Sequence, residues 1–263
     1  MEVTDLLKSV PFFKAGKKKQ ESSPESKVLS ESTPFFVKES YKTLRTNLAF
    51  SMPNQEHRIV LITSAYVSEG KSTSCLNTAI TFAETGAKVC VVDCDLRKPN
   101  VARLCAQKGS PGLSNVLAGF QKLENVVRKE VYPNLDVLFS GDIPPNPAEL
   151  LESEAMDTVL HTLAKQYDYV FLDTPPVNVV TDAVLLTAKV DGVLLVVHYQ
   201  KTTKTELSKA IAQLEFVKAK ILGVLLNDIK TEKRSYGKNG GCKYYKHYSH
   251  TPKPSVPGVK NHD

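Results

Sequence analysis

Short apolar runs alternate with amphipathic segments through the middle of the chain. The runs RIVLITS at 58–64 and KVCVVDCD at 88–95 are apolar at most positions, and similar runs begin at residues 134, 167, 191 and 221. Strands that are apolar throughout are typical of parallel sheets buried on both faces. Because helical segments separate them, the pattern predicts an α/β fold: a mostly parallel sheet with helices on both faces.

The segments between the runs have the periodicity of helices. Residues 35–51 predict a helix whose apolar face is formed by Val37, Tyr41, Leu44 and Leu48. Residues 71–86 predict a helix that stops at a glycine. Residues 111–130 look helical with a break at Gly119, and residues 146–166 predict one long helix opened by a proline.

Sequence of a different character flanks this core. Residues 1–34 include a stretch rich in Lys, Ser, Glu and Pro and predict a flexible leader, whereas 35–229 predict one domain. Residues 230–263 have no periodicity and predict a disordered tail. The net charge is +6, and residues 229–263, with eight Lys/Arg and two Asp/Glu, account for all of it. We therefore expect no nucleic-acid partner, although the tail could contact phosphates or acidic lipid.

The chain has the composition of a cytoplasmic protein. Its five cysteines are odd in number and show no paired C-x-x-C spacing, which favours a reducing compartment and disfavours a cysteine metal site. No apolar run reaches the roughly 18 residues of a transmembrane helix. The N-terminal segment also lacks the apolar core of a signal peptide.

The stretch TSAYVSEGKSTS at 63–74 resembles a phosphate-binding loop. It lies between a predicted strand and a predicted helix, which is the context that such a loop requires. Gly70 would let the backbone approach phosphates, Lys71 would reach the β- and γ-phosphates, and the Ser72 hydroxyl would bind Mg²⁺. Ala65 stands where the common motif has its first glycine, so a chance GKS at a turn is the alternative. The predicted nucleotide-binding residues of the loop are Ser68, Glu69, Gly70, Lys71, Ser72 and Thr73.

Polar residues follow several later strands. Asp93 and Asp95 end the run at 88–95, and Asp173 ends the run at 167–174. Ligands bind at the carboxyl ends of strands in open α/β sheets, so these carboxylates would lie at the same edge as the loop and would hold Mg²⁺ or its waters. Asn227 ends the last run, where its amide could contact adenine or simply form a turn. The predicted metal ligands are Ser72, Asp93 and Asp173.

These motifs resemble those of a known family. The loop, VVDCDLRKP and FLDTPP resemble the Walker A, A′ and B motifs of the bacterial tyrosine kinases, or BY-kinases. The chain is most similar to the stand-alone cytoplasmic kinases of capsular or exopolysaccharide biosynthesis in Gram-positive bacteria. The resemblance covers about residues 39–227 and includes GDIPPNPAELL at 141–151. It implies ATP and Mg²⁺ as cofactors and catalytic roles for Lys71, Asp93, Asp95 and Asp173, with Asp95 as the base.

The predicted helix 35–51 bears on assembly. BY-kinases have an E-x-x-R-x-x-R signature that links subunits into a ring, and Glu39 and Arg45 match it. Lys42 replaces the middle arginine, which keeps the charge but loses the planar fork of a guanidinium group. The resemblance thus implies a ring; a solvated helix face with ion pairs three residues apart is the alternative.

Four tyrosines of the tail fall within a 13-residue window among glycines and lysines: Tyr236, Tyr244, Tyr245 and Tyr248. The cluster resembles the autophosphorylated tail of the family; the alternative is an aromatic–basic patch for nucleic acid or membrane. The resemblance also implies a membrane-anchored activator with a cytoplasmic tail, recruitment to the inner face of the membrane, and a cognate tyrosine phosphatase.

Two other functions remain as alternatives. Positioning ATPases of the MinD/ParA type carry a K-G-G-x-G-K-S/T loop, whereas this chain has Tyr66 at the position of the first lysine and Val67 and Ser68 at those of the two glycines. That difference disfavours a positioning ATPase. A nucleotide-gated scaffold without essential kinase activity is the second alternative.

Overall fold

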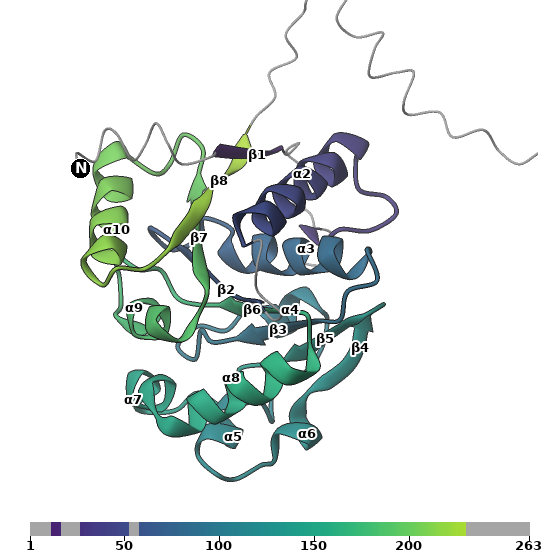
Figure 1. Ribbon diagram of the computed structural model, residues 1–263, viewed down its shortest axis with the longest axis vertical. Coiled ribbons are helices and arrows are strands. Elements are labelled where there is room, and N and C mark those ends of the chain that lie inside the picture. The colour runs from purple at the N-terminus through teal and green to yellow at the C-terminus, as the bar shows by residue number, and fades with distance from the viewer. Residues whose placement is uncertain (1–11, 17–26, 53–57, 230–263) are drawn as a thin grey trace, which may run out of the picture. The chain divides into compact units, whose positions relative to one another are not determined.

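A mixed, mostly parallel sheet forms the centre of the domain (Figure 1). The computed structural model describes residues 12–16, 27–52 and 58–229. Within these residues the sheet has eight strands in the order β1-β8-β7-β2-β6-β3-β5-β4. The strands are β1 Phe12–Gly16, β2 Arg58–Ser64, β3 Val89–Asp93, β4 Arg128–Tyr132, β5 Leu135–Leu138, β6 Tyr169–Asp173, β7 Gly192–His198 and β8 Ile221–Ile229. The pairings of these strands are parallel except for β4 with β5, which confirms the predicted fold class.

Helices cover both faces of this sheet (Figure 1). Their bounds are α2 Phe35–Ser51, α3 Lys71–Ala83, α4 Val101–Leu104, α5 Leu113–Leu117, α6 Leu123–Val126, α7 Pro147–Glu152, α8 Glu154–Gln166, α9 Asp182–Leu186, the 3₁₀ helix η2 Thr187–Lys189 and α10 Lys204–Phe216. Helices α2 and α3 lie on one face, and α5, α7 and α8 lie on the other. No described helix is long and apolar enough to span a membrane.

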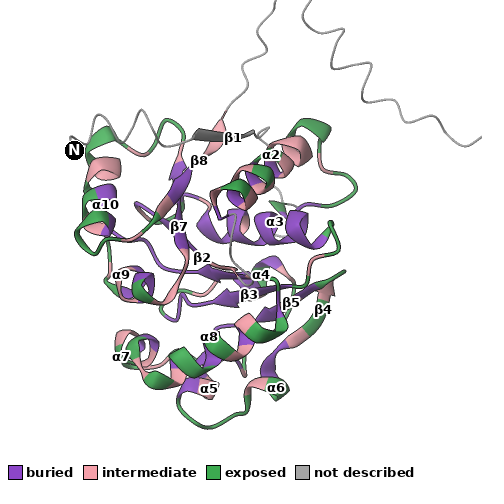
Figure 2. Ribbon diagram, viewed as in Figure 1, coloured by how far each residue is buried: buried purple, intermediate pink, exposed green. Residues whose placement is uncertain are grey.

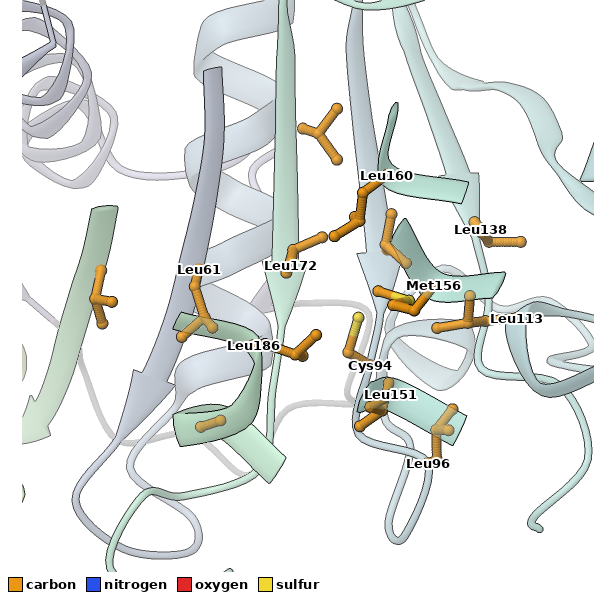
Figure 3. Packing of buried hydrophobic residues seen from close by; sticks show 14 of the residues in the cluster. Leu61, Cys94, Leu96, Leu113, Leu138, Leu151, Met156, Leu160, Leu172 and Leu186 are labelled. Atoms are coloured by element: carbon orange, nitrogen blue, oxygen red, sulfur yellow. The ribbon is translucent and has the colours of Figure 1, made fainter. Parts of the chain in front are cut away.

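Successive residues of the strands supply two separate hydrophobic cores. Val60 and Ile62 of β2 pack with α2 and α3, whereas Leu61 between them packs with the helices of the other face. This alternation is the geometry of a strand buried on both sides. The central strands β2, β3, β6 and β7 and the helix α3 are accordingly almost fully buried, whereas the edge strand β4 is not (Figure 2). In the core that contains Leu61, Cys94 lies among Leu151, Leu186 and neighbouring leucines (Figure 3).

The strand order places β2 at the middle of the sheet. β2 pairs with β6 on one side and with β7 on the other. The loop after β2 therefore opens between the carboxyl ends of neighbouring parallel strands, which is where open α/β sheets bind ligands.

The helical prediction for residues 111–130 was wrong over much of its length. Only the short helices α5 and α6 form there, and residues 128–132 are the edge strand β4. The two residues between β4 and β5 are Pro133 and Asn134, and Asn134 has a positive φ of 60°. Proline and asparagine are typical of tight turns, so the hairpin signal was present in the sequence.

The helix expected over 146–166 is divided into α7 and α8. Pro147 opens α7 as predicted, but Ser153 takes an extended conformation between the two helices. Its hydroxyl donates to the carbonyl of Leu150 at 2.7 Å. Such a local hydrogen bond competes with helix continuation, which explains the break.

Part of the expected flexible leader is structured. β1 pairs in parallel with β8, and Val28 and Leu29 are buried. The Leu29 backbone N–H donates to the Asn77 side chain of α3 at 2.8 Å, and Asn77 in turn donates to the carbonyl of Lys27. The predicted disordered tail, 230–263, lies outside the described residues.

Candidate nucleotide-binding and phosphoryl-transfer site

The phosphate loop connects β2 to α3 at the middle of the sheet. Gly70 is the N-cap residue of α3 and has a φ of 91°, a conformation that side chains rarely adopt. A Cβ atom at this position would lie 2.1 Å from the side-chain nitrogen of Asn227. Only glycine fits here, and it directs the first backbone amides of α3 toward the loop, as anion binding at a helix N-terminus requires.

Lys71 lies at the centre of a buried charge cluster. Its ammonium nitrogen is 2.8 Å from Oδ2 of Asp95 and 3.4 Å from Oδ1 of Asp173. It also donates to the Ser72 hydroxyl at 3.2 Å. Asp93 is the register partner of Asp173 on the adjacent strand. The structure therefore brings together the four predicted catalytic residues at one edge of the sheet.

Burial and charge shift the protonation of this cluster. Burial lowers the pKa of Lys71, but the carboxylates of Asp173 and Asp95 outweigh it, so the net pKa is raised and the lysine stays charged. Burial, together with the charge of Asp173, raises the pKa of Asp93. Burial likewise raises the pKa of Asp173, against the opposing effect of Lys71. Burial destabilises the charged form of these carboxylates, and a cationic ligand beside them would stabilise it.

The donor set fits a magnesium ion held jointly with a nucleotide. Oδ2 of Asp173 is buried and has no hydrogen-bond partner among the described residues, and the neighbouring Ser72 is also buried. Within the described residues, no group of three or more acidic, histidine or cysteine side chains could hold a metal by itself. Mg²⁺ beside a nucleotide normally uses one or two carboxylates plus phosphate oxygens and waters. The predicted ligands Ser72 and Asp173 fit that arrangement.

Asp93 and Asp95 have different surroundings within the same motif. Oδ1 of Asp93 accepts from the Asp95 backbone N–H at 3.2 Å, and Oδ2 accepts from the Val101 N–H at 3.1 Å. Asp95 accepts from the Lys98 backbone N–H at 3.0 Å through the oxygen that does not face Lys71. Asp93 thus shapes the loop after β3, while Asp95 presents an oxygen to the lysine.

Asn227 lies against the phosphate loop. Its side-chain Nδ2 donates to the backbone carbonyl of Glu69 at 2.9 Å. One of the two N–H donors of this amide is therefore used in holding the loop, and the adenine contact stays a prediction. Ser68, exposed with a positive φ of 61°, and Thr73 occupy the loop and the first turn of α3.

An ion pair beside the aspartates was not predicted from the sequence. Arg97 makes two hydrogen bonds to Asp182, from Nε at 2.8 Å and from Nη2 at 2.9 Å. Asp182 is fully buried at the start of α9, and Arg97 follows Asp95 in the loop after β3. The pair fixes this loop to the segment that follows β6. An arginine two residues after Asp95 gave no indication, in the sequence, of a partner 85 residues away.

We expect Arg97→Leu to lower the free energy of unfolding by about 2 kcal/mol. Removing one partner of a buried pair costs roughly 3–5 kcal/mol, and we reduce the value because the Arg97 side chain is 40% exposed to screening solvent. Urea unfolding measures the change. Arg103→Leu is the matched control, because Arg103 donates to the neutral side chain of Asn100 and forms no ion pair within the described residues. Equal losses in both variants would contradict the prediction.

The predicted assembly residues lie on α2. Lys42 pairs with Glu39 at 2.8 Å, both about half exposed, as in the alternative of a solvated face with pairs three residues apart. Arg45 instead donates from Nη1 to the carbonyl of Thr81 in α3 at 2.6 Å. Their role in a ring stays a prediction. The four predicted acceptor tyrosines, Tyr236, Tyr244, Tyr245 and Tyr248, lie outside the described residues.

Comparison with known proteins places this site in a family. A family model described as an AAA domain matches residues 57–227. The chain is 42% identical over 203 residues to tyrosine-protein kinase YwqD of Bacillus subtilis, and the match covers 77% of this chain and 86% of YwqD. The chain belongs to the BY-kinase family.

Solved structures agree with this assignment. The BY-kinase described here is similar to the chimerical protein CapA2B2, with a TM-score of 0.78 and 32% identity over 87% of this chain and 98% of that one. It is also similar to the kinase domain of the Escherichia coli tyrosine kinase ETK, with a TM-score of 0.77 and 28% identity over 90% and 97% of the two chains. Its function is therefore that of a tyrosine kinase with a nucleotide-binding phosphate loop.

The positioning ATPases are more distant from this BY-kinase. MinD of Pyrococcus horikoshii, whose structure is a complex with Mg-ADP, has a TM-score of 0.57 and 25% identity over 68% of this chain and 73% of that one. The shared fold explains why the sequence left MinD/ParA-type function as an alternative. The kinase domains match more of the chain and superpose better.

Proposed function

We propose that this BY-kinase transfers the γ-phosphate of ATP to tyrosine hydroxyls, first of all to those of its own tail. The observation that carries the proposal is the buried cluster in which Lys71 contacts both Asp95 and Asp173 beside the phosphate loop. Similarity to named tyrosine-protein kinases over most of the chain supports it.

Different residues of the site would bind the phosphates, compensate their charge and accept the proton of tyrosine. The amides of the loop and the start of α3 would bind the phosphates, and Lys71 would offset their charge. Mg²⁺ beside Ser72 and Asp173 would supply further positive charge. A tyrosine hydroxyl has a pKa of about 10 and is a poor nucleophile at neutral pH, so it needs a proton acceptor. We assign that role to Asp95.

Lys71 links phosphate binding to the proposed base. In the structure its ammonium contacts Oδ2 of Asp95 at 2.8 Å. A bound phosphate would compete with this carboxylate for the same ammonium. Oδ2 of Asp95 would then become free to accept the proton from tyrosine.

The proposal extends to the cell and to partners. We infer a role in regulating capsular or exopolysaccharide biosynthesis, in the cytoplasm at the inner face of the membrane. The inferred partners are a membrane-anchored activator with a cytoplasmic tail, further copies of the chain in a ring through Glu39, Lys42 and Arg45, and a cognate tyrosine phosphatase. Similarity to the CapB and CpsD tyrosine kinases, of which the chain covers 87% and 89%, supports the comparison with stand-alone members.

Labelling with γ-labelled ATP and Mg²⁺ tests the function, with and without the cytoplasmic tail of a candidate activator. We expect label on tyrosine in the wild type and its loss when Tyr236, Tyr244, Tyr245 and Tyr248 are all changed to Phe. Tyr132→Phe, a half-buried tyrosine of β4, is the control and should retain the label. ATP hydrolysis without protein label, even with the activator, would favour the positioning ATPase or the scaffold instead.

A further inference from the structure

A buried carboxylate within the phosphate loop connects the loop to the segment that follows β7. The Glu69 side chain is only 1% exposed, although it belongs to a loop that receives phosphates. Its Oε2 accepts from the Tyr66 backbone N–H at 2.9 Å, and its Oε1 accepts from the Thr202 hydroxyl. Both carboxylate oxygens are therefore used within the protein, one by the loop itself and one by the segment after β7.

Thr202 and its neighbours continue the contact to the adjacent strands. The Thr202 hydroxyl accepts from the His198 backbone N–H at 2.9 Å while it donates to Glu69. Lys201 donates to the carbonyl of Val67 at 3.3 Å, and Asn227 of β8 donates to the carbonyl of Glu69 at 2.9 Å. The loop is thus hydrogen-bonded to the carboxyl ends of both β7 and β8.

The charge of Glu69 is unfavourable for direct phosphate binding. A carboxylate near a triphosphate repels it, and burial raises the pKa of Glu69 against the effect of the hydrogen bonds from Thr202 and the loop backbone. A buried charge is retained at such a cost only where it is well hydrogen-bonded. Its favourable contribution must therefore come from the shape that it gives to the loop.

The loop of this chain has particular need of such support. Ala65 occupies the position of the first glycine of the common motif, and Ser68 takes a positive φ of 61° without being glycine. Strained backbone of this kind persists only where surrounding contacts fix it. The carboxylate of Glu69 bonds across the same turn, to the N–H of Tyr66.

We propose that Glu69 and Thr202 form a positioning pair that keeps the phosphate loop in its nucleotide-binding shape. The pair acts on the loop rather than on the reacting atoms. This inference rests on the nucleotide binding in the proposed function but not on transfer to tyrosine.

Binding of a fluorescent ADP with Mg²⁺ to the full chain tests the pair directly. We expect Thr202→Val to weaken binding about tenfold or more, the effect of one lost hydrogen bond to a charged acceptor, and Thr202→Ser to bind like the wild type. Glu69→Gln should also weaken binding, because its amide nitrogen cannot accept from a donor. In the double variant the two losses should not add, since either change already breaks the pair.

A control and a kinetic readout separate positioning from general instability. Thr205→Val changes an exposed threonine at the start of α10 and should leave the dissociation constant unchanged. If tyrosine labelling occurs, Thr202→Val should raise KM for ATP while kcat at saturating ATP stays within about threefold, as expected for lost ground-state positioning. Binding within twofold of the wild type for Thr202→Val, or fully additive losses in the double variant, would overturn the proposal. Normal ADP binding without any tyrosine label would contradict the proposed function but leave this inference standing.

Discussion

Lys71→Met is expected to reduce tyrosine phosphorylation at least about a hundredfold, the usual cost of removing a preorganised group that stabilises transferred charge. Lys71 is the cation at the centre of the carboxylate cluster, 2.8 Å from Asp95 and 3.4 Å from Asp173. Without it, the charge of a bound triphosphate would face the aspartates without a protein counter-charge. Incorporation of γ-labelled phosphate into tyrosine, measured at saturating Mg²⁺, gives the rate.

Two further variants make this result specific. Lys129→Met is the matched control, because Lys129 also pairs with an aspartate, Asp136 at 2.9 Å, but at the β4–β5 edge of the sheet. It should phosphorylate at the wild-type rate. Circular dichroism shows whether Lys71→Met is folded, and Lys71→Arg retains the charge if it is not. Wild-type phosphorylation by folded Lys71→Met would contradict the assigned role of Lys71.

Gly70→Ala is expected to slow phosphorylation about a hundredfold, the effect of a misplacement of about 1 Å at a reacting centre. A Cβ atom on Gly70 would meet the side-chain nitrogen of Asn227 at 2.1 Å, so either the loop or Asn227 must move. The positive φ of 91° adds strain for any residue with a side chain. The labelling rate and the affinity for fluorescent ADP should both fall.

Gly86→Ala separates the clash from the strain. Gly86 has nearly the same φ, 89°, but an added Cβ there meets nothing within 4 Å. It should cost about 1–2 kcal/mol of stability and leave ADP binding unchanged. Adding Asn227→Ala to Gly70→Ala should restore part of the affinity by removing the contact. Equal affinities of Gly70→Ala and Gly86→Ala for ADP would show that the clash does not matter.

The six central strands of the sheet and the location of the site could be predicted from the sequence, whereas the edge strands β1 and β4 could not. A strand with a continuous apolar run, such as 58–64, buries all its side chains only where helices cover both faces of the sheet. Such runs therefore predicted buried parallel strands. The phosphate loop is encoded locally, between β2 and α3. Asp93 and Asp173 could be assigned to the same edge because parallel strands align their carboxyl ends.

Local competition explains where the sequence misled. Residues 128–132 have neighbours compatible with a helix, but they form β4, which is stabilised by pairing with β5. Ser153 also has such neighbours, but its hydroxyl donates to the backbone carbonyl of Leu150. Intrinsic helix propensity is a small effect and is easily outweighed by pairing with a neighbouring strand or by a side-chain hydrogen bond to the backbone.

The contacts that hold the site together became visible only in the folded protein. Arg97 meets Asp182 across 85 positions of sequence, and Glu69 meets Thr202 across 133. No periodicity or motif spacing encodes such pairs, because they depend on which loops the packed sheet brings to the same edge. The sequence identifies the chemical groups of the site, and the packing of the sheet and its loops determines which of these groups are in contact.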